Sequence, residues 1–125
     1  MIELHRLIKS FSHALRGVCV VFKTEQSFRI QTGIAFLVLL LALFFHIQAF
    51  EWIILLLLVG SVLSLELINS IFERIVDTFK PRIHPVVKDI KDIMAGAVLL
   101  GSLLSLFVGI TIFFPYALEL VRSFA

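Results

Sequence analysis

Three stretches of the chain are apolar for longer than helices of soluble domains usually are, and each is long enough to cross a bilayer. They cover residues 30–50, 52–79 and 93–118. The first has an uncharged core only over 33–45, so its polar flanks must lie at the membrane interfaces. The second begins at Trp52, a residue type that favours that interface, and the third carries no charge. The pattern predicts an all-α membrane protein with three transmembrane helices.

Residues 1–24 have a different pattern, that of an amphipathic helix. Its apolar side chains recur at steps of three and four residues, and they are Leu4, Leu7, Ile8, Phe11, Leu15, Val18 and Phe22. The basic face carries Arg6, Lys9, His13 and Arg16. Such a helix can lie in the plane of the lipid headgroups, or it can pack on its own protein. We expect an N-terminal surface helix in which both contacts can hold.

The distribution of charge predicts the orientation of the spans. The 125-residue chain is 60% hydrophobic with a net charge of +2, and its Lys and Arg residues fall into two blocks. One block precedes the first span and the other lies between the second and third, at 74–91. Positively charged segments stay on the cytoplasmic side, so we expect the N-terminus inside and the C-terminus outside. The length favours a single domain.

The approach to the third span and its packing can also be read from the sequence. Residues 80–92 are charged and contain two prolines, which predicts a loop or a short surface helix. Small residues then recur every four positions along the span, at Ala97, Gly101, Ser105 and Gly109. Such a stripe lets helix backbones approach closely in lipid, so it is a candidate packing seam, also between subunits.

A line of polar side chains interrupts the second span. Its members are Glu66, Asn69, Glu73 and Asp77. The spacing of i, i+3, i+7 and i+11 places them within about 80° around a helix and over about 16 Å of its length. The bland alternative is that these carboxylates only pair with Lys and Arg of other helices, while Arg74 faces the headgroups. We favour a functional site, because acidic groups inside a span usually face a partner or a cavity.

The same residues suggest a metal. Three carboxylates and an amide on one face offer the oxygen ligands that Mg²⁺ prefers, and this ion completes its shell with phosphate and water. Glu25, just before the first span, lies at the same membrane level and could supply a second carboxylate. Lys88 and Lys91 lie at a level where they could meet phosphate. The sequence contains no G-x-x-x-x-G-K-[ST] loop, so a nucleotide would be held without one.

Residues 66–77, Glu-Leu-Ile-Asn-Ser-Ile-Phe-Glu-Arg-Ile-Val-Asp, resemble the signature of the prokaryotic diacylglycerol kinase family, which includes the undecaprenol kinases. That signature is Glu-x-x-Asn-Ser/Thr-x-x-Glu-x-x-x-Asp. Further matches are Arg6, Arg16-Gly17, Glu25-x-x-Phe28-Arg29, His84, and Lys91-Asp92 followed by residues 94–99. The resemblance covers about residues 6–118.

The resemblance implies a homotrimeric, ATP- and Mg²⁺-dependent lipid kinase of the bacterial inner membrane, with its active site between subunits at the cytoplasmic face. Glu66 would then be the general base that takes the proton from the lipid hydroxyl. Glu25 and Glu73 would hold Mg²⁺ on the ATP phosphates, supported by Asn69 and Asp77. The residues implied to contact the nucleotide are Arg6, His13, His84, Lys91 and Asp92. The implied partners are the lipid, ATP and further copies of the chain, and we expect no nucleic-acid partner.

The acceptor lipid and the enzyme class each have an alternative. Gln31, His13 and Leu15 depart from the diacylglycerol kinase branch, whereas residues 84–85 and 95–97 are more similar to undecaprenol kinases, so we favour undecaprenol over diacylglycerol. The rival to an enzyme is an oligomer that conducts or binds cations through its acidic line. We favour the enzyme, because a pore should carry polar residues through the whole membrane. Here they stop near Glu66 and leave the outer half of the span apolar.

Overall fold

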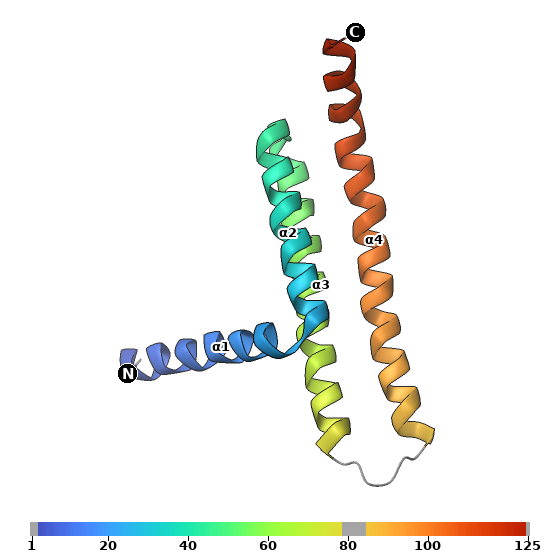
Figure 1. Cartoon of the computed structure of the whole chain (residues 1–125). Coiled ribbons are helices and arrows are strands. Elements are labelled where there is room, and N and C mark those ends of the chain that lie inside the picture. Colours follow the sequence, from blue (N-terminus) through green and yellow to red (C-terminus); the bar gives the residue numbers. More distant parts are fainter. Residues whose placement is uncertain (1–2, 79–84, 125) are drawn as a thin grey trace.

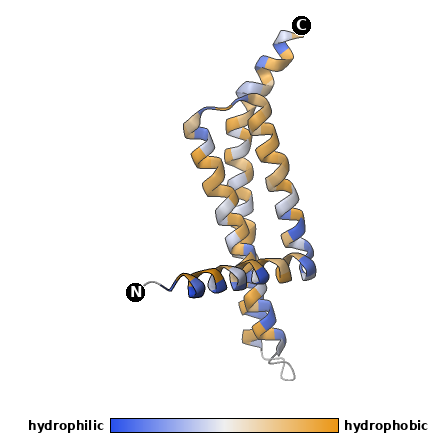
Figure 2. Ribbon diagram, turned by 90° about the vertical axis from the view of Figure 1, so that its left-hand side faces the viewer, coloured by the Kyte–Doolittle hydropathy of each residue, from blue (hydrophilic) through white to orange (hydrophobic). Residues whose placement is uncertain are grey.

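The structure is a computed structural model that describes residues 3–78 and 85–124, and over these residues it is all α-helical. Its helices are α1 (Leu4–Thr24), α2 (Gln26–Phe45), α3 (Ala49–Thr78) and α4 (Pro85–Ser123). The last three are long and apolar enough to cross a membrane, which confirms the three predicted spans. Figure 2 shows their apolar middle parts and the mixed polarity of α1.

The three long helices run antiparallel to their chain neighbours, and α1 leaves them at a steep angle (Figure 1). Helix α3 lies in the middle of the arrangement, because both α2 and α4 pack on it. We call the end of the bundle at which α1 branches off the α1 end, and the opposite end the far end. The line of polar residues on α3 lies at the α1 end.

A single extended residue, Glu25, separates α1 from α2. In a continuous helix, the carbonyls of Phe22 and Lys23 would accept bonds from backbone N–H groups four residues later. Here Nη1 of Arg29 donates to both oxygens instead, at 3.4 and 3.0 Å. Because carbonyls at a helix end need a partner, this side chain stabilises the bend.

At the far end, a three-residue turn joins α2 to α3. His46 has φ 51°, the left-handed conformation that often ends a helix. The carboxylate of Glu51 accepts a bond of 2.8 Å from the backbone N–H of Gln48, which caps the start of α3. The same carboxylate accepts a hydrogen bond from the hydroxyl of Tyr116 on α4.

Helix α4 corrects one expectation and bears out another in part. Residues 85–92 form neither a loop nor a separate surface helix, because they are the first two turns of α4, which begins at Pro85. Proline suits the first helical position, since its missing N–H would have no partner there. The small-residue stripe is a seam within the chain at Gly101, where an added Cβ would lie 2.9 Å from Cδ1 of Leu65 on α3.

Candidate active site

Glu66 is the most enclosed acidic residue of the bundle that the structure describes, with 3% of its surface exposed. It lies on the side of α3 that faces α2. The hydroxyl of Ser27, in the first turn of α2, donates to its Oε2 over 3.2 Å. The charges of Glu73 and Glu25 lie close enough to act on Glu66 electrostatically. Burial of a carboxylate beside two like charges is costly, which marks this position as a functional candidate.

One turn further along α3, Asn69 and Glu73 form a pair. The side-chain N–H of Asn69 donates to Oε1 of Glu73 over 3.2 Å. Within the described residues, the buried Oδ1 of Asn69 has no hydrogen-bond partner. A buried amide oxygen without a hydrogen-bond partner is unusual. Its lone pairs are therefore available to a hydrogen-bond donor or a metal ion of a ligand.

Glu25 reaches the same region from the bend between α1 and α2. Nη2 of Arg74 lies 3.4 Å from its Oε1 and also donates to the hydroxyl of Thr24. This contact ties the bend to α3.

The last acidic residue of the line, Asp77, connects α3 to α4. Nζ of Lys91 lies 2.8 Å from its Oδ1. The bland alternative for the acidic line therefore holds in part, because Asp77 pairs with a cation of another helix. Lys88 and Asp92 lie exposed on the same part of α4.

Of the other nucleotide candidates, Arg6 lies apart from this cluster, whereas His13 lies at its border. Arg6 belongs to the N-terminal part of α1, which points away from the bundle (Figure 1), and it pairs with Glu3. His13, further along α1, lines a cavity together with Arg74. His84 lies outside the described residues.

The described side chains offer oxygen ligands for magnesium but do not form a complete cage around it. Among the described residues, no three Asp, Glu, His or Cys side chains come together as a metal cage. Two carboxylates, of Glu25 and Glu73, with the unpaired amide oxygen of Asn69, match an ion that relies on phosphate and water for its other ligands. Such a site would be completed by phosphate groups of a bound substrate and by water.

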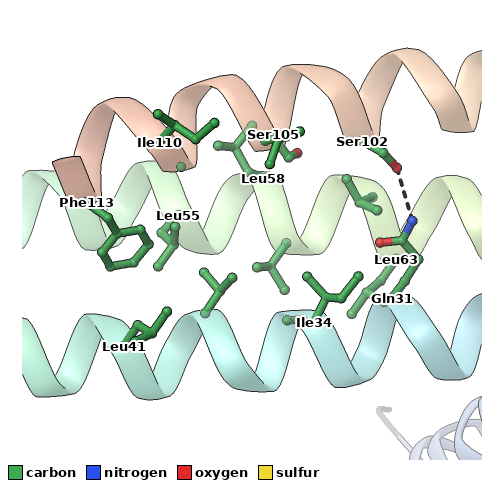
Figure 3. A pocket seen from close by; sticks show the side chains of 16 residues that line it. Gln31, Ile34, Leu41, Leu55, Leu58, Leu63, Ser102, Ser105, Ile110 and Phe113 are labelled. Carbon is green, nitrogen blue, oxygen red and sulfur yellow. Dashed lines mark hydrogen bonds between the residues drawn. The ribbon is translucent and has the colours of Figure 1, made fainter. Parts of the chain in front are cut away.

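An apolar cavity of about 460 Å³ runs between α2, α3 and α4 towards the far end. Its wall is mainly aliphatic, and Figure 3 shows Gln31 hydrogen-bonded to Ser102 at one end, over 3.1 Å. Gln31 lies one helical turn from Ser27, and Ser27 donates to the carboxylate of Glu66. This polar end of the cavity is therefore close to Glu66. Our sequence analysis missed Ser27. Its spacing of four from Gln31, at the start of a span, was the available signal.

Comparison with known proteins identifies the family. Residues 12–113 match the family model described as prokaryotic diacylglycerol kinase. The chain belongs to this family. It is 39% identical over 113 residues to the undecaprenol kinase of Bacillus subtilis, covering 90% of this chain and 92% of that protein. It is 36% identical to a diacylglycerol kinase of Synechocystis, covering 92% of this chain and 66% of that protein. A diacylglycerol kinase of Helicobacter pylori is 30% identical over 103 residues, which are 82% of this chain and 80% of that protein.

Undecaprenol kinases and diacylglycerol kinases are lipid kinases. The chain is accordingly a membrane-bound lipid kinase. A kinase of this kind implies ATP as the phosphoryl donor. Membership of the family decides against the non-enzymatic cation conduit.

Proposed function

We propose that this lipid kinase transfers the γ-phosphoryl group of ATP, bound as its magnesium complex, to the hydroxyl of a membrane lipid at the cytoplasmic face. The observation that carries the proposal is the burial of Glu66 between α2 and α3, beside the carboxylates of Glu25 and Glu73. Phosphoryl transfer needs mainly positioning and charge neutralisation, so a few well-placed groups suffice.

Glu66 is the proposed general base. Its carboxylate accepts the proton of the lipid hydroxyl, and the hydrogen bond from Ser27 orients it. Because Ser27 is neutral, it holds the carboxylate without balancing its charge. Burial also keeps bulk water away, which favours transfer to the lipid over hydrolysis of ATP.

Glu25 and Glu73 are the proposed magnesium ligands, and Asn69 supports them. Magnesium would supply positive charge on the phosphates as negative charge develops there. Asn69 orients Glu73 through its N–H and offers its unpaired oxygen to the same site. Asp77 positions Lys91, which together with Asp92, His13, His84 and Arg6 would contact the nucleotide.

A homotrimer is part of the proposal, because in a single chain Glu25 and Glu73 stay partly exposed although Glu66 is buried. The unpacked side of α3 carries small residues in mid-membrane, and they are Gly60, Ser61 and Ser64, all exposed. Small residues let helices pack closely in lipid, which supports contact between α3 helices of different subunits. A neighbouring subunit would also give Arg6, at the outlying end of α1, a site to reach.

Undecaprenol is the favoured acceptor, ahead of diacylglycerol. The similarity to an undecaprenol kinase over most of both chains supports this choice. The aliphatic cavity near Glu66 offers a place for a hydrocarbon chain whose hydroxyl points towards the base. We place the protein in the bacterial inner membrane with its N-terminus cytoplasmic, because the Lys and Arg blocks lie on that side.

The test is transfer of labelled phosphate from ATP to undecaprenol and to diacylglycerol, assayed side by side with Mg²⁺. We expect transfer to undecaprenol to be the faster. Glu66→Gln should lower turnover by about 100-fold or more, because the base is lost while the shape is kept. Glu119→Gln, at an exposed carboxylate near the end of α4, is the matched control and should stay near wild type.

Two results would contradict the proposal. A folded wild-type protein that phosphorylates neither lipid would rule out the reaction. A Glu66→Gln variant with near-normal turnover and unchanged helical content would remove the base role alone.

A further inference from the structure

Arg74 forms an ion pair with Glu25, one of the two carboxylates proposed to bind magnesium. It follows Glu73 on α3, but its guanidinium points to the bend between α1 and α2, where it contacts Glu25 and Thr24. The side chains of Arg74 and Glu25 are 45% and 24% exposed. Partly exposed pairs of this kind are weak, so another cation can displace the arginine.

A second cavity of about 370 Å³, shallow and largely open, lies beside this ion pair, between α1 and α3. Its lining includes three basic side chains, of His13, Arg16 and Arg74, on an apolar floor that includes Val21 and Ile71. Within the described part of the chain, neither His13 nor Arg16 has a carboxylate partner. Basic groups without carboxylate partners in a cavity attract an anion, and the planar fork of arginine suits phosphate.

We propose that Arg74 exchanges partners during the reaction. In the free protein it neutralises Glu25. When the metal-bound nucleotide arrives, Arg74 releases Glu25 to the metal and binds a phosphate oxygen in the adjoining cavity. This inference rests on the proposed function, since it takes Glu25 as a metal ligand and ATP as the donor. Its physical basis is that one carboxylate oxygen cannot serve a guanidinium and a divalent cation equally well, because the two cations repel each other.

The first test measures metal binding without nucleotide, using Mn²⁺ detected by electron paramagnetic resonance in place of Mg²⁺. Arg74→Ala should bind Mn²⁺ about threefold more tightly, because a competing cation is gone. Arg74→Lys keeps the charge and should stay close to wild type. Arg16→Ala removes the same charge from the same cavity without touching Glu25, so it should change Mn²⁺ binding less than Arg74→Ala does. Weaker or unchanged Mn²⁺ binding by Arg74→Ala would overturn the exchange.

The second test measures the KM for ATP at saturating Mg²⁺. Arg74→Ala should raise this KM about tenfold, because a charge-assisted hydrogen bond to phosphate is lost, with a smaller effect on kcat. Arg74→Lys should recover part of the loss. A purely structural role predicts that metal and nucleotide binding weaken together, whereas the exchange predicts opposite signs.

The outcomes also separate this inference from the proposed function. An active wild type in which Arg74→Ala changes neither Mn²⁺ affinity nor the KM for ATP contradicts the exchange alone. A wild type that transfers phosphate to neither lipid contradicts the proposed function, and the Mn²⁺ titration then still decides whether Arg74 competes for Glu25.

Discussion

The acidic side chains of the site differ in their neighbours, and these neighbours separate their roles. Glu66 has a neutral hydroxyl donor, whereas Glu25 and Asp77 each pair with a cation. Glu73 is held by the amide of Asn69. A carboxylate without a bound cation is free to accept a proton, and one held by an amide can still bind a metal. The contacts therefore support a base at 66 and a ligand at 73.

At this scale, Glu73→Gln should raise the Mg²⁺ concentration needed for half-maximal activity by about tenfold or more, because the ligand loses its charge. A magnesium titration at saturating ATP measures this. Asp89→Asn, an exposed carboxylate in the first turns of α4, serves as the control and should leave the titration unchanged. An unaltered magnesium requirement in Glu73→Gln would count against ligation.

At the scale of elements, side-chain contacts rather than a helix-breaking residue stabilise the bend between α1 and α2. The segment 22–29 contains neither Gly nor Pro. Arg29 occupies the two carbonyl oxygens that would otherwise continue the helix. Without it, α1 and α2 can join into one helix, because a continuous backbone ladder would satisfy the same oxygens.

We therefore expect Arg29→Ala to populate a straightened form. Spin labels on the native Cys19 and on Leu40→Cys would lie about 32 Å apart along a continuous helix, and closer in the bent chain. Double electron–electron resonance on labelled protein diluted with unlabelled protein should show a new peak in the distance distribution near the longer distance. Lys9→Ala, elsewhere on α1, should not show it. A single distance equal to that of the bent protein would contradict this role of Arg29.

For the whole molecule, the sequence predicted the spans and the acidic line, because both follow from periodicities of single helices. It did not predict which side chains meet across helices, such as Ser27 with Glu66 or Arg74 with Glu25, since these depend on how the helices pack. It also treated the charged residues 85–92 as separate from the third span. The hydropathy pattern shows only where the apolar stretch begins, near residue 93. The backbone hydrogen bonds of α4 begin earlier, at Pro85.

The proposed trimer is a prediction at the same scale. A short amine-reactive cross-linker applied to protein in detergent should give a ladder of species that ends at three copies. Ser64→Phe would place a large side chain on the exposed side of α3 and should weaken the trimer. Leu37→Phe, on the exposed side of α2, is the control. A ladder that ends at two copies, or a Ser64→Phe protein that is as trimeric as wild type, would contradict packing through α3.

Helices α3 and α4 are fastened together near both ends, by Lys91 with Asp77 at one and by Tyr116 with Glu51 at the other. Contacts at two separate points limit how far the two helices can rotate against each other. We expect α3 and α4 to move little relative to each other during the catalytic cycle, because these contacts act together with the close approach of the two helices at Gly101. Rearrangement is then expected mainly in α1, which joins the bundle through the extended residue Glu25.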